Sequence, residues 1–158
     1  MELELFYDGI TEEEINKENT RIACRGIVKR DGLFLMVHLK KYDIYTFPGG
    51  GLEPLETLSE CTVRELLEET GIKVKVLEEK VTIKEFFLDS TWENHYHICE
   101  YIEDTNSVNL TEEETDLGLE VKWMKLDDIL EIFEESLTLH ENGPTIHNRE
   151  FLGLMNSL

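Results

Sequence analysis

The chain has 158 residues, of which 41% are hydrophobic, and this size suits one compact domain spanning residues 1–158. Thirty-five acidic residues against 15 basic ones give a net charge of −20, which repels nucleic-acid backbones and anionic membrane surfaces. We therefore expect neither a nucleic acid polymer nor a membrane as a partner. No basic leader or long apolar run is present, and three unpaired cysteines suit a reducing compartment, so a cytoplasmic location is expected.

The first half of the chain predicts a hairpin, a short strand, a loop and a helix, in that order. Residues 21–39 contain two β-prone runs around Asp31-Gly32, a pair that favours a tight turn. A strand at 45–47 leads into a glycine loop at 48–51, which could present backbone atoms to a ligand. A helix follows over Leu58–Thr70, with Thr57 and Glu60 as a capping box and Gly71 as its stop.

The second half predicts mainly strands. Apolar runs at 73–77, 81–88, 95–102 and 119–124 are typical of strands, and a helix near 127–134 begins at Asp127 or Asp128. A weaker pattern indicates a last helix near 147–156. We expect residues 1–19 and 136–158 to be peripheral. Because hairpins are frequent and crossover helices few, the fold class is α/β (α+β), a sandwich with a mixed sheet.

The helix at 58–70 carries the chemistry. At about 100° per residue, Glu65, Glu68 and Glu69 share one arc and Arg64 lies near its edge, while apolar residues face the other way. Glutamates three or four residues apart repel one another, so a cation is the natural counter-charge. Three glutamates alone would more simply be a solvated helix face. Carboxylate and carbonyl oxygens are nevertheless the donors that Mg²⁺ or Mn²⁺ select, in preference to zinc.

The flanking residues favour the metal interpretation. Residues 50–72, GGLEPLETLSECTVRELLEETGI, match the Nudix box G-x5-E-x7-R-E-U-x-E-E-x-G-U, where U is a bulky aliphatic residue. A chance match in a chain of this length is of order one in a million. The chain therefore resembles the Nudix (MutT-like) hydrolase family over roughly residues 20–135. The matching positions are Gly50, Glu56, Arg64, Glu65, Leu66, Glu68, Glu69, Gly71 and Ile72.

The resemblance implies an α/β/α sandwich in which the box binds a divalent metal and a substrate pyrophosphate. By position, Glu65, Glu68 and Glu69 would ligate Mg²⁺, with Mn²⁺ as a substitute, and a carbonyl near Gly49 could complete the shell. Glu56 would brace the loop or hold a metal. Leu55 stands where the family often has glycine, and Cys61-Thr62 replace the usual small alanines, which could alter the loop's shape.

The catalytic prediction is Glu65 as general base, oriented with its neighbours by Arg64. In this family the base can also lie outside the box, and this alternative stays open. The candidates there are Glu112, Glu113, Glu114 and Glu120.

Other candidate residues concern substrate contacts. Polyphosphate binding by an acidic protein needs local positive charge, which predicts phosphate contacts at Arg25, Lys40 and Lys41, beside backbone contacts at Gly49 and Gly50. Stacking on a nucleobase has three aromatic candidates on strands, although packing is the commoner role for such residues. They are Tyr45, Trp92 and Tyr96.

Strand alternation places His95, His97 and Cys99 on one face. Since a closed zinc site needs four ligands, packing or substrate contact is the more natural role, and the sequence does not choose between them.

The resemblance thus predicts a metal-dependent hydrolase that cleaves a pyrophosphate bond in a small nucleotide such as a nucleoside triphosphate or a sugar nucleotide. Two alternatives are a non-catalytic Nudix-fold nucleotide sensor, which a degenerate box would favour, and an acidic cation-binding protein. The sequence signatures of ADP-ribose, dinucleoside polyphosphate, NADH and coenzyme A hydrolases are absent, so the specific substrate is undetermined. The oligomeric state, including a homodimer, also stays open.

Overall fold

The hairpin around Asp31-Gly32 is present in the computed structural model, which describes residues 1–158. β2 (Thr20–Arg30) and β3 (Leu33–Leu39) pair in antiparallel fashion, and Asp31 and Gly32 have positive φ angles of 52° and 79°. Two positive φ values in a two-residue loop match the twist of the strands on either side. The hairpin links two parts of one sheet, because β3 also pairs with β4 (Ile44–Thr46) and β8 (Leu119–Lys125).

The larger part of the sheet is built on β2. β7 (Thr91–Asp104) lies parallel to β2, β6 (Ile72–Phe86) is antiparallel to β7, and β1 (Glu2–Phe6) is parallel to β6. The strand order is β1-β6-β7-β2-β3-β4, with β5 (Gly49–Gly51) paired to β2 and β8 paired to β3. The predicted mixed sheet is confirmed.

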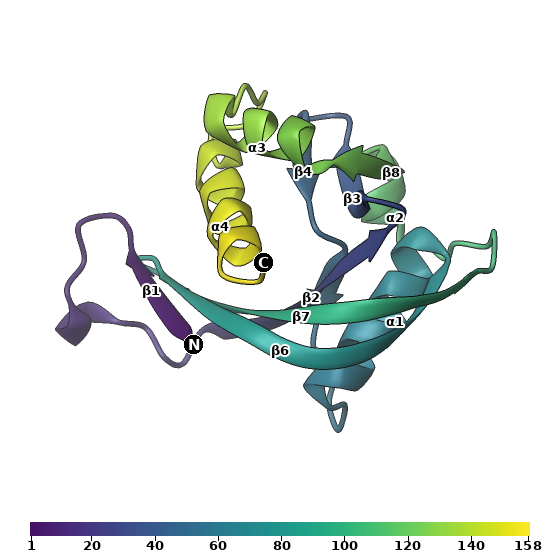
Figure 1. Cartoon of the computed structure of the whole chain (residues 1–158). Coiled ribbons are helices and arrows are strands. Elements are labelled where there is room, and N and C mark those ends of the chain that lie inside the picture. The colour runs from purple at the N-terminus through teal and green to yellow at the C-terminus, as the bar shows by residue number, and fades with distance from the viewer.

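Helices cover both faces of this sheet. The helices are a short 3-10 turn at Glu12–Glu14, α1 (Leu58–Thr70), α2 (Glu112–Asp116), α3 (Leu126–Glu135) and α4 (Gly143–Met155). α1 lies on one side of the long β6–β7 ribbon, and α3 and α4 lie on the other (Figure 1). Two buried clusters fill the layers, one joining Tyr96 to Leu154 of α4 and one joining Leu66 of α1 to Val74. The α/β fold is confirmed.

Several predicted elements differ from the structure in their bounds. The strands at 73–77 and 81–88 form one continuous β6, because register shifts absorb the polar residues between them. The glycine loop contains a short strand, β5, paired with β2. α3 begins at Leu126 with Lys125 as its N-cap, so Asp127 and Asp128 lie in the first turn rather than at the cap.

The two segments that we expected to be peripheral are parts of the packed structure. β1 extends the sheet beside β6, and its Leu3 and Leu5 pack against the core. α4 begins four residues before the predicted helix and buries Leu154 together with Arg149 and Glu150. Because charged residues occupy buried positions of α4, its inward face is not a continuous apolar stripe, which explains why the sequence indicates this helix only weakly. None of the helices combines the length and the hydrophobic character that a transmembrane span requires.

Candidate active site

α1 is fixed at both ends by hydrogen bonds that its own sequence supplies. Thr57 Oγ1 accepts from the Glu60 amide at 3.1 Å, and Glu60 Oε1 accepts from the Thr57 amide at 3.3 Å. Gly71 ends the helix with a left-handed φ of 73°. Both the predicted capping box and the glycine stop are confirmed. On the inner face, a Cβ on Gly26 would lie 2.6 Å from a Leu66 methyl carbon, so α1 rests directly on β2.

Arg64 is the centre of a network of carboxylates on the outer face of α1. Its Nε and Nη2 donate to the two oxygens of Glu56 at 2.6 and 2.9 Å, which is a bidentate pair. Nη1 donates to Glu65 at 2.9 Å and to Glu68 at 3.3 Å, and Nη2 also reaches the Gly51 carbonyl at 3.0 Å. Arg64 lowers the pKa of Glu56 to about 2, because the guanidinium stabilises the ionised carboxylate. Glu56 therefore has the contacts of a residue that braces the loop.

Glu65 lies against the glycine strand. A Cβ on Gly50 would come within 2.5 Å of the Glu65 carboxyl carbon, so this close approach requires glycine. Burial raises the pKa of Glu65, while the hydrogen bond from Arg64 acts in the opposite direction. Gly50 thus serves to admit the Glu65 carboxylate.

Glu69 is the most deeply placed carboxylate of the box, with 7% of its surface exposed. Its Oε1 accepts the Gly49 amide at 2.7 Å. Burial raises the pKa of Glu69 well above its usual range, and a hydrogen bond with Glu114 raises it further. Glu114 is on α2, and the segment that leads to α2 is tied to α1 by a 2.7 Å bond from the Asn109 amide to the Glu68 carbonyl. The fold therefore brings one of the acidic residues outside the box to Glu69.

The pairing of Glu69 with Glu114 suits a divalent cation. Two adjacent carboxylates that are partly shielded from water repel each other, and they offer a metal ion only oxygen atoms as ligands. Mg²⁺ is usually held by one or two carboxylates together with water and substrate phosphates, rather than by a cage of protein ligands. No three His, Cys, Asp or Glu side chains of residues 1–158 form such a cage, and this mode of binding does not require one.

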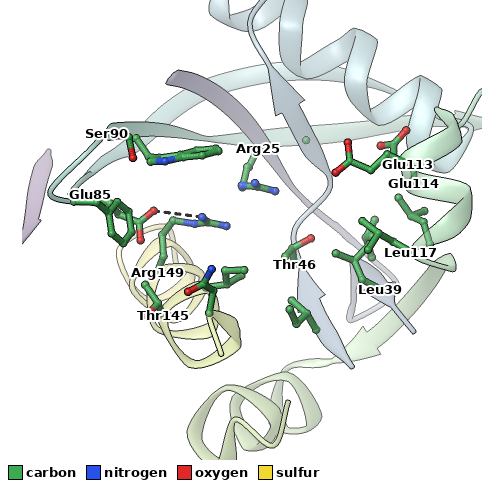
Figure 2. A pocket seen from close by; sticks show the side chains of 18 of the residues that line it. Arg25, Leu39, Thr46, Glu85, Ser90, Glu113, Glu114, Leu117, Thr145 and Arg149 are labelled. Carbon is green, nitrogen blue, oxygen red and sulfur yellow. Dashed lines mark hydrogen bonds and ion pairs between the residues drawn. The ribbon is translucent and has the colours of Figure 1, made fainter. Parts of the chain in front are cut away.

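A pocket of about 750 Å³ opens beside this carboxylate pair. Its lining includes Gly49, Glu69, Glu113 and Glu114 at one end, and Arg25 of β2 also projects into it. Figure 2 shows Glu113 and Glu114 on one side of the space, with Arg25 near its middle. A volume of this size accommodates a nucleotide-sized ligand.

The predicted substrate contacts separate into two groups. Arg25 and Gly49 line the pocket, and Arg25 is held in place by a 3.0 Å bond from Nη1 to the Phe47 carbonyl. Lys40 forms an ion pair with Glu120 at 3.6 Å and Lys41 lies over the ring of Tyr42, and neither side chain lines the pocket.

Of the aromatic candidates, Trp92 lines the pocket. Tyr96 is fully buried and accepts a 3.1 Å hydrogen bond from Arg149, and Tyr45 stacks on His38 with the ring centroids 4.1 Å apart. The last two therefore have packing contacts.

The histidines of β7 face away from the pocket, toward α1 and the outer part of β6. His97 Nδ1 lies 3.0 Å from Thr62 Oγ1 of α1, and His95 lies between Glu79 and Glu93. Neither histidine lines the pocket. Burial lowers the pKa of His97, which favours its neutral form.

All three cysteines are buried and free. Cys61 Sγ lies 3.7 Å from the Gly50 carbonyl oxygen, and the pKa of Cys61 is raised by a hydrogen bond with Cys24 and by burial. A thiol held in the neutral form is a poor nucleophile, so Cys61 has a packing role.

A buried ion cluster at the other end of the pocket was not predicted from the sequence. Arg149 of α4 donates to Glu85 of β6 at 3.3 Å and to Glu150 at 2.7 Å, and Arg25 lies 3.4 Å from Glu150. Arg149 and Glu85 both line the pocket. In the sequence, Arg149 and Glu150 stand in a helical segment that also contains other polar residues, so nothing distinguishes them as parts of a site.

A model of the NUDIX domain matches residues 19–144. The chain is 29% identical over 138 residues to mRNA-decapping enzyme subunit 2 of Arabidopsis thaliana, in a match that covers 83% of this chain and 36% of that protein. It is 26% identical over 127 residues to the human diphosphoinositol polyphosphate phosphohydrolase NUDT4B, covering 78% of this chain and 66% of that protein. The chain thus spans about a third of the first relative and just under two thirds of the second.

Solved structures show the same fold. A NUDIX hydrolase from Nitrosomonas europaea superposes with a TM-score of 0.69 at 16% identity, covering 88% of each chain. A MutT protein from Methanosarcina mazei Go1 has a TM-score of 0.61 at 19% identity, covering 87% of this chain and 96% of that one. With a family model matched over residues 19–144 and the complete box carried by the glycine strand, the following loop and α1, this chain belongs to the NUDIX domain family.

Proposed function

We propose that this chain hydrolyses a pyrophosphate bond in a nucleoside diphosphate derivative, in a reaction that depends on Mg²⁺ and accepts Mn²⁺. One observation carries this proposal. The Glu69–Glu114 pair forms one end of a nucleotide-sized pocket that also contains Arg25 and aromatic side chains. Bound Mg²⁺ would supply charge neutralisation at the diphosphate oxygens and acidify a water molecule.

The charges of the pocket favour a substrate with few phosphates. Six carboxylates and only two arginines line it, the arginines being Arg25 and Arg149. The names of the two relatives refer to mRNA and to diphosphoinositol polyphosphates, and both of these molecules carry many phosphate groups. Such a substrate would meet a chain of net charge −20 and a mainly acidic pocket. A small nucleotide whose diphosphate is neutralised at the Glu69 end fits these charges better.

The residues around the scissile bond would have three different roles: positioning carboxylates, binding the metal and contacting a phosphate. Arg64 positions Glu65 and Glu68 through ion pairs, and Glu69 with its neighbours would hold the metal. Arg25 would contact a phosphate oxygen with a guanidinium N–H that its present partners leave free.

The proton acceptor is either Glu65, predicted from the box, or a glutamate outside it. Of the outside candidates, Glu113 and Glu114 line the pocket and Glu112 and Glu120 do not. Glu65 is not among the lining residues and is bonded to Arg64. These contacts favour Glu114 as the group that takes the proton from the attacking water.

The first test is turnover of a panel of nucleoside triphosphates and sugar nucleotides with Mg²⁺ or Mn²⁺ by wild type and Glu69→Gln. The substitution removes a charge at the metal end while keeping the side-chain volume, so kcat should fall at least about 100-fold. Glu131→Gln makes the same change at an exposed position on α3 and should leave kcat unaltered. Wild-type turnover by Glu69→Gln, or nucleotide binding without any cleavage, would contradict the proposal.

Two further variants in the same assay identify the proton acceptor. Loss of a general base lowers kcat and removes the acidic limb of the pH–rate profile, whereas loss of a positioning group lowers kcat but keeps that limb. We expect Glu114→Gln to remove the limb and Glu65→Gln to retain it; the reverse result would restore Glu65 as the base.

A further inference from the structure

The pocket has two chemically different ends. Glu113 and Glu114 of α2 lie at one end, and Glu85 of β6 and Arg149 of α4 lie at the other (Figure 2). Glu69 of α1, which also lines the pocket, is next to Glu114. If the diphosphate lies at the first end, as the proposed function requires, the group attached to it extends toward the second. The second end therefore determines which nucleoside is accepted.

Glu85 presents an acceptor at this second end. Only 2% of its surface is exposed, so its carboxylate is largely shielded from bulk water. Both of its hydrogen bonds, from Arg149 at 3.3 Å and from Asn94 at 3.5 Å, are made to Oε1. Oε2 accepts no hydrogen bond from the protein, and these two bonds to Oε1 are long. A buried carboxylate gains stability from further N–H donors, which a ligand can supply.

Arg149 fixes the position of this carboxylate. Its Nε donates to Tyr96 Oη at 3.1 Å, its Nη2 to Glu150 at 2.7 Å and its Nη1 to Glu85. A guanidinium has five N–H groups, so two remain available on a side chain that lines the pocket. The pair thus offers a ligand a fixed acceptor with a fixed donor beside it.

Aromatic side chains flank the pair. Trp92 is directly opposite Glu85 in the β6–β7 register, which places both side chains on the same face of the sheet. Phe87 also lines the pocket and stacks on Tyr7, with the ring centroids 4.9 Å apart. A planar heterocycle can therefore stack here while its edge meets Glu85.

We infer that Glu85 selects a guanine base, whose N1–H and N2–H groups donate to the carboxylate while the neighbouring O6 accepts from Arg149. Only guanine presents two adjacent donors on its pairing edge. Adenine and cytosine present one amino group beside a ring nitrogen lone pair, and uracil presents one N–H between two carbonyls, so each places a lone pair against the carboxylate. This assignment rests on the proposed function, because it requires the diphosphate to lie at the Glu69 end.

The wild-type protein tests the inference without any mutation. We would measure kcat/KM for the triphosphates of guanosine, inosine, adenosine and cytidine, together with the 8-oxo form of guanosine triphosphate, which has the same pairing edge. The kcat/KM of guanosine triphosphate should be about tenfold or more above that of adenosine triphosphate. It should exceed the value for inosine triphosphate, which lacks the N2 amino group, by a similar factor. Equal values for guanosine and adenosine would overturn the inference. A kcat/KM for the 8-oxo form above that for guanosine triphosphate would also support recognition by Glu85, and it would identify the oxidised base as the preferred substrate.

The variant Glu85→Gln separates recognition from a structural role. Glutamine replaces one acceptor oxygen with an N–H₂ donor that repels a guanine donor. The kcat/KM values of guanosine and inosine triphosphate should therefore come within about threefold of each other. If Glu85 only balanced the charge of Arg149, all substrates would decline together and the ratio would be unchanged. Glu78→Gln is the matched control, since Glu78 is an exposed residue of the same strand paired with Lys80, and it should keep the wild-type ratio.

The outcomes distinguish this inference from the proposed function. Absence of cleavage for every nucleotide would refute the function itself, whereas cleavage without base preference would refute only the assignment of Glu85. Should Glu85→Gln fail to fold, shown by loss of its cooperative thermal transition, the wild-type substrate series alone decides.

Discussion

Glu56 and Glu69 belong to the same motif but have opposite electrostatic environments. Glu56 is paired through both oxygens with Arg64, which lowers its pKa to about 2. Glu69 is buried beside Glu114, and burial raises its pKa well above 4.5. The ionised form of Glu56 therefore stabilises the fold, while the ionised form of Glu69 destabilises it. This contrast is expected where a binding site retains uncompensated charge for a ligand.

Glu69→Gln should consequently raise the melting temperature at pH 7 in the absence of divalent metal, although we expect the same substitution to lower kcat. The amide keeps an acceptor for the Gly49 N–H and removes the repulsion with Glu114. The rise should be about 2–4 °C for each kcal/mol relieved in a chain of this size. Thermal unfolding of wild type, Glu69→Gln and Glu131→Gln in a chelator measures the effect. A lower melting temperature for Glu69→Gln alone would show that its charge is compensated.

The opposite pKa shifts of Glu56 and Glu69 also make the stability of the chain depend on pH. Since the folded pKa of Glu69 is raised, its destabilising effect is complete above that pKa and disappears as pH falls toward 4.5. Since the folded pKa of Glu56 is lowered, its contribution is complete above 4.5 and is lost as pH falls through about 2. The advantage of Glu69→Gln over wild type should therefore shrink between pH 7 and pH 5, which unfolding at several pH values would reveal.

Among the elements, α1 depends on its C-terminal glycine for more than a turn. Gly71 has a φ of 73°, and a Cβ there would lie 2.8 Å from the carbonyl oxygen of Ser107, in the segment that leads to α2. The Gly71 carbonyl also accepts from the Thr105 amide at 2.8 Å. The end of the box helix is thus locked to the segment that carries Glu114 to Glu69.

Gly71→Ala should destabilise the chain by about 2–4 kcal/mol, from the left-handed conformation and the contact with Ser107 together. Gly9→Ala is the matched control, because Gly9 has a φ of 67° with open space around its Cβ position. That control should cost only about 1–2 kcal/mol, the backbone contribution alone. Chemical denaturation of both variants measures the difference, and equal losses would show that the Ser107 contact is relieved without cost.

Over the whole molecule, the net charge of −20 opposes compaction and makes cations stabilising in two distinct ways. Any salt screens the general repulsion between surface carboxylates. A divalent ion bound near Glu69 would add a saturable contribution, because it binds the folded state specifically.

Thermal unfolding in NaCl and MgCl₂ at matched ionic strength separates these contributions. NaCl should raise the melting temperature of wild type and Glu69→Gln equally. MgCl₂ should raise the melting temperature of wild type further, by about 5 °C or more when Mg²⁺ is at ~100 times its Kd for the protein. The melting temperature of Glu69→Gln should show no such additional rise. Identical curves for the two salts in wild type would argue against a metal site on α1.

Features that depend on residues close together in the chain could be predicted from the sequence alone. The Asp31-Gly32 turn, the capped helix from Leu58 to Thr70 and the acidic face of that helix follow from local backbone preferences and helical periodicity. Their spacing was sufficient to indicate the family. The carboxylates of α1 were therefore identified without any knowledge of distant residues.

Long-range packing brings together the distant residues that would complete the proposed site. Glu114, Glu85 and Arg149 come from α2, β6 and α4, and no spacing along the chain relates them to the box. Sheet order and helix packing bring them together, and the electrostatic interactions of the buried side chains are then stronger than they would be in water. Local chemistry thus accounts for the carboxylates of α1, whereas Glu114 beside them and the Glu85–Arg149 end of the pocket both arise from long-range packing.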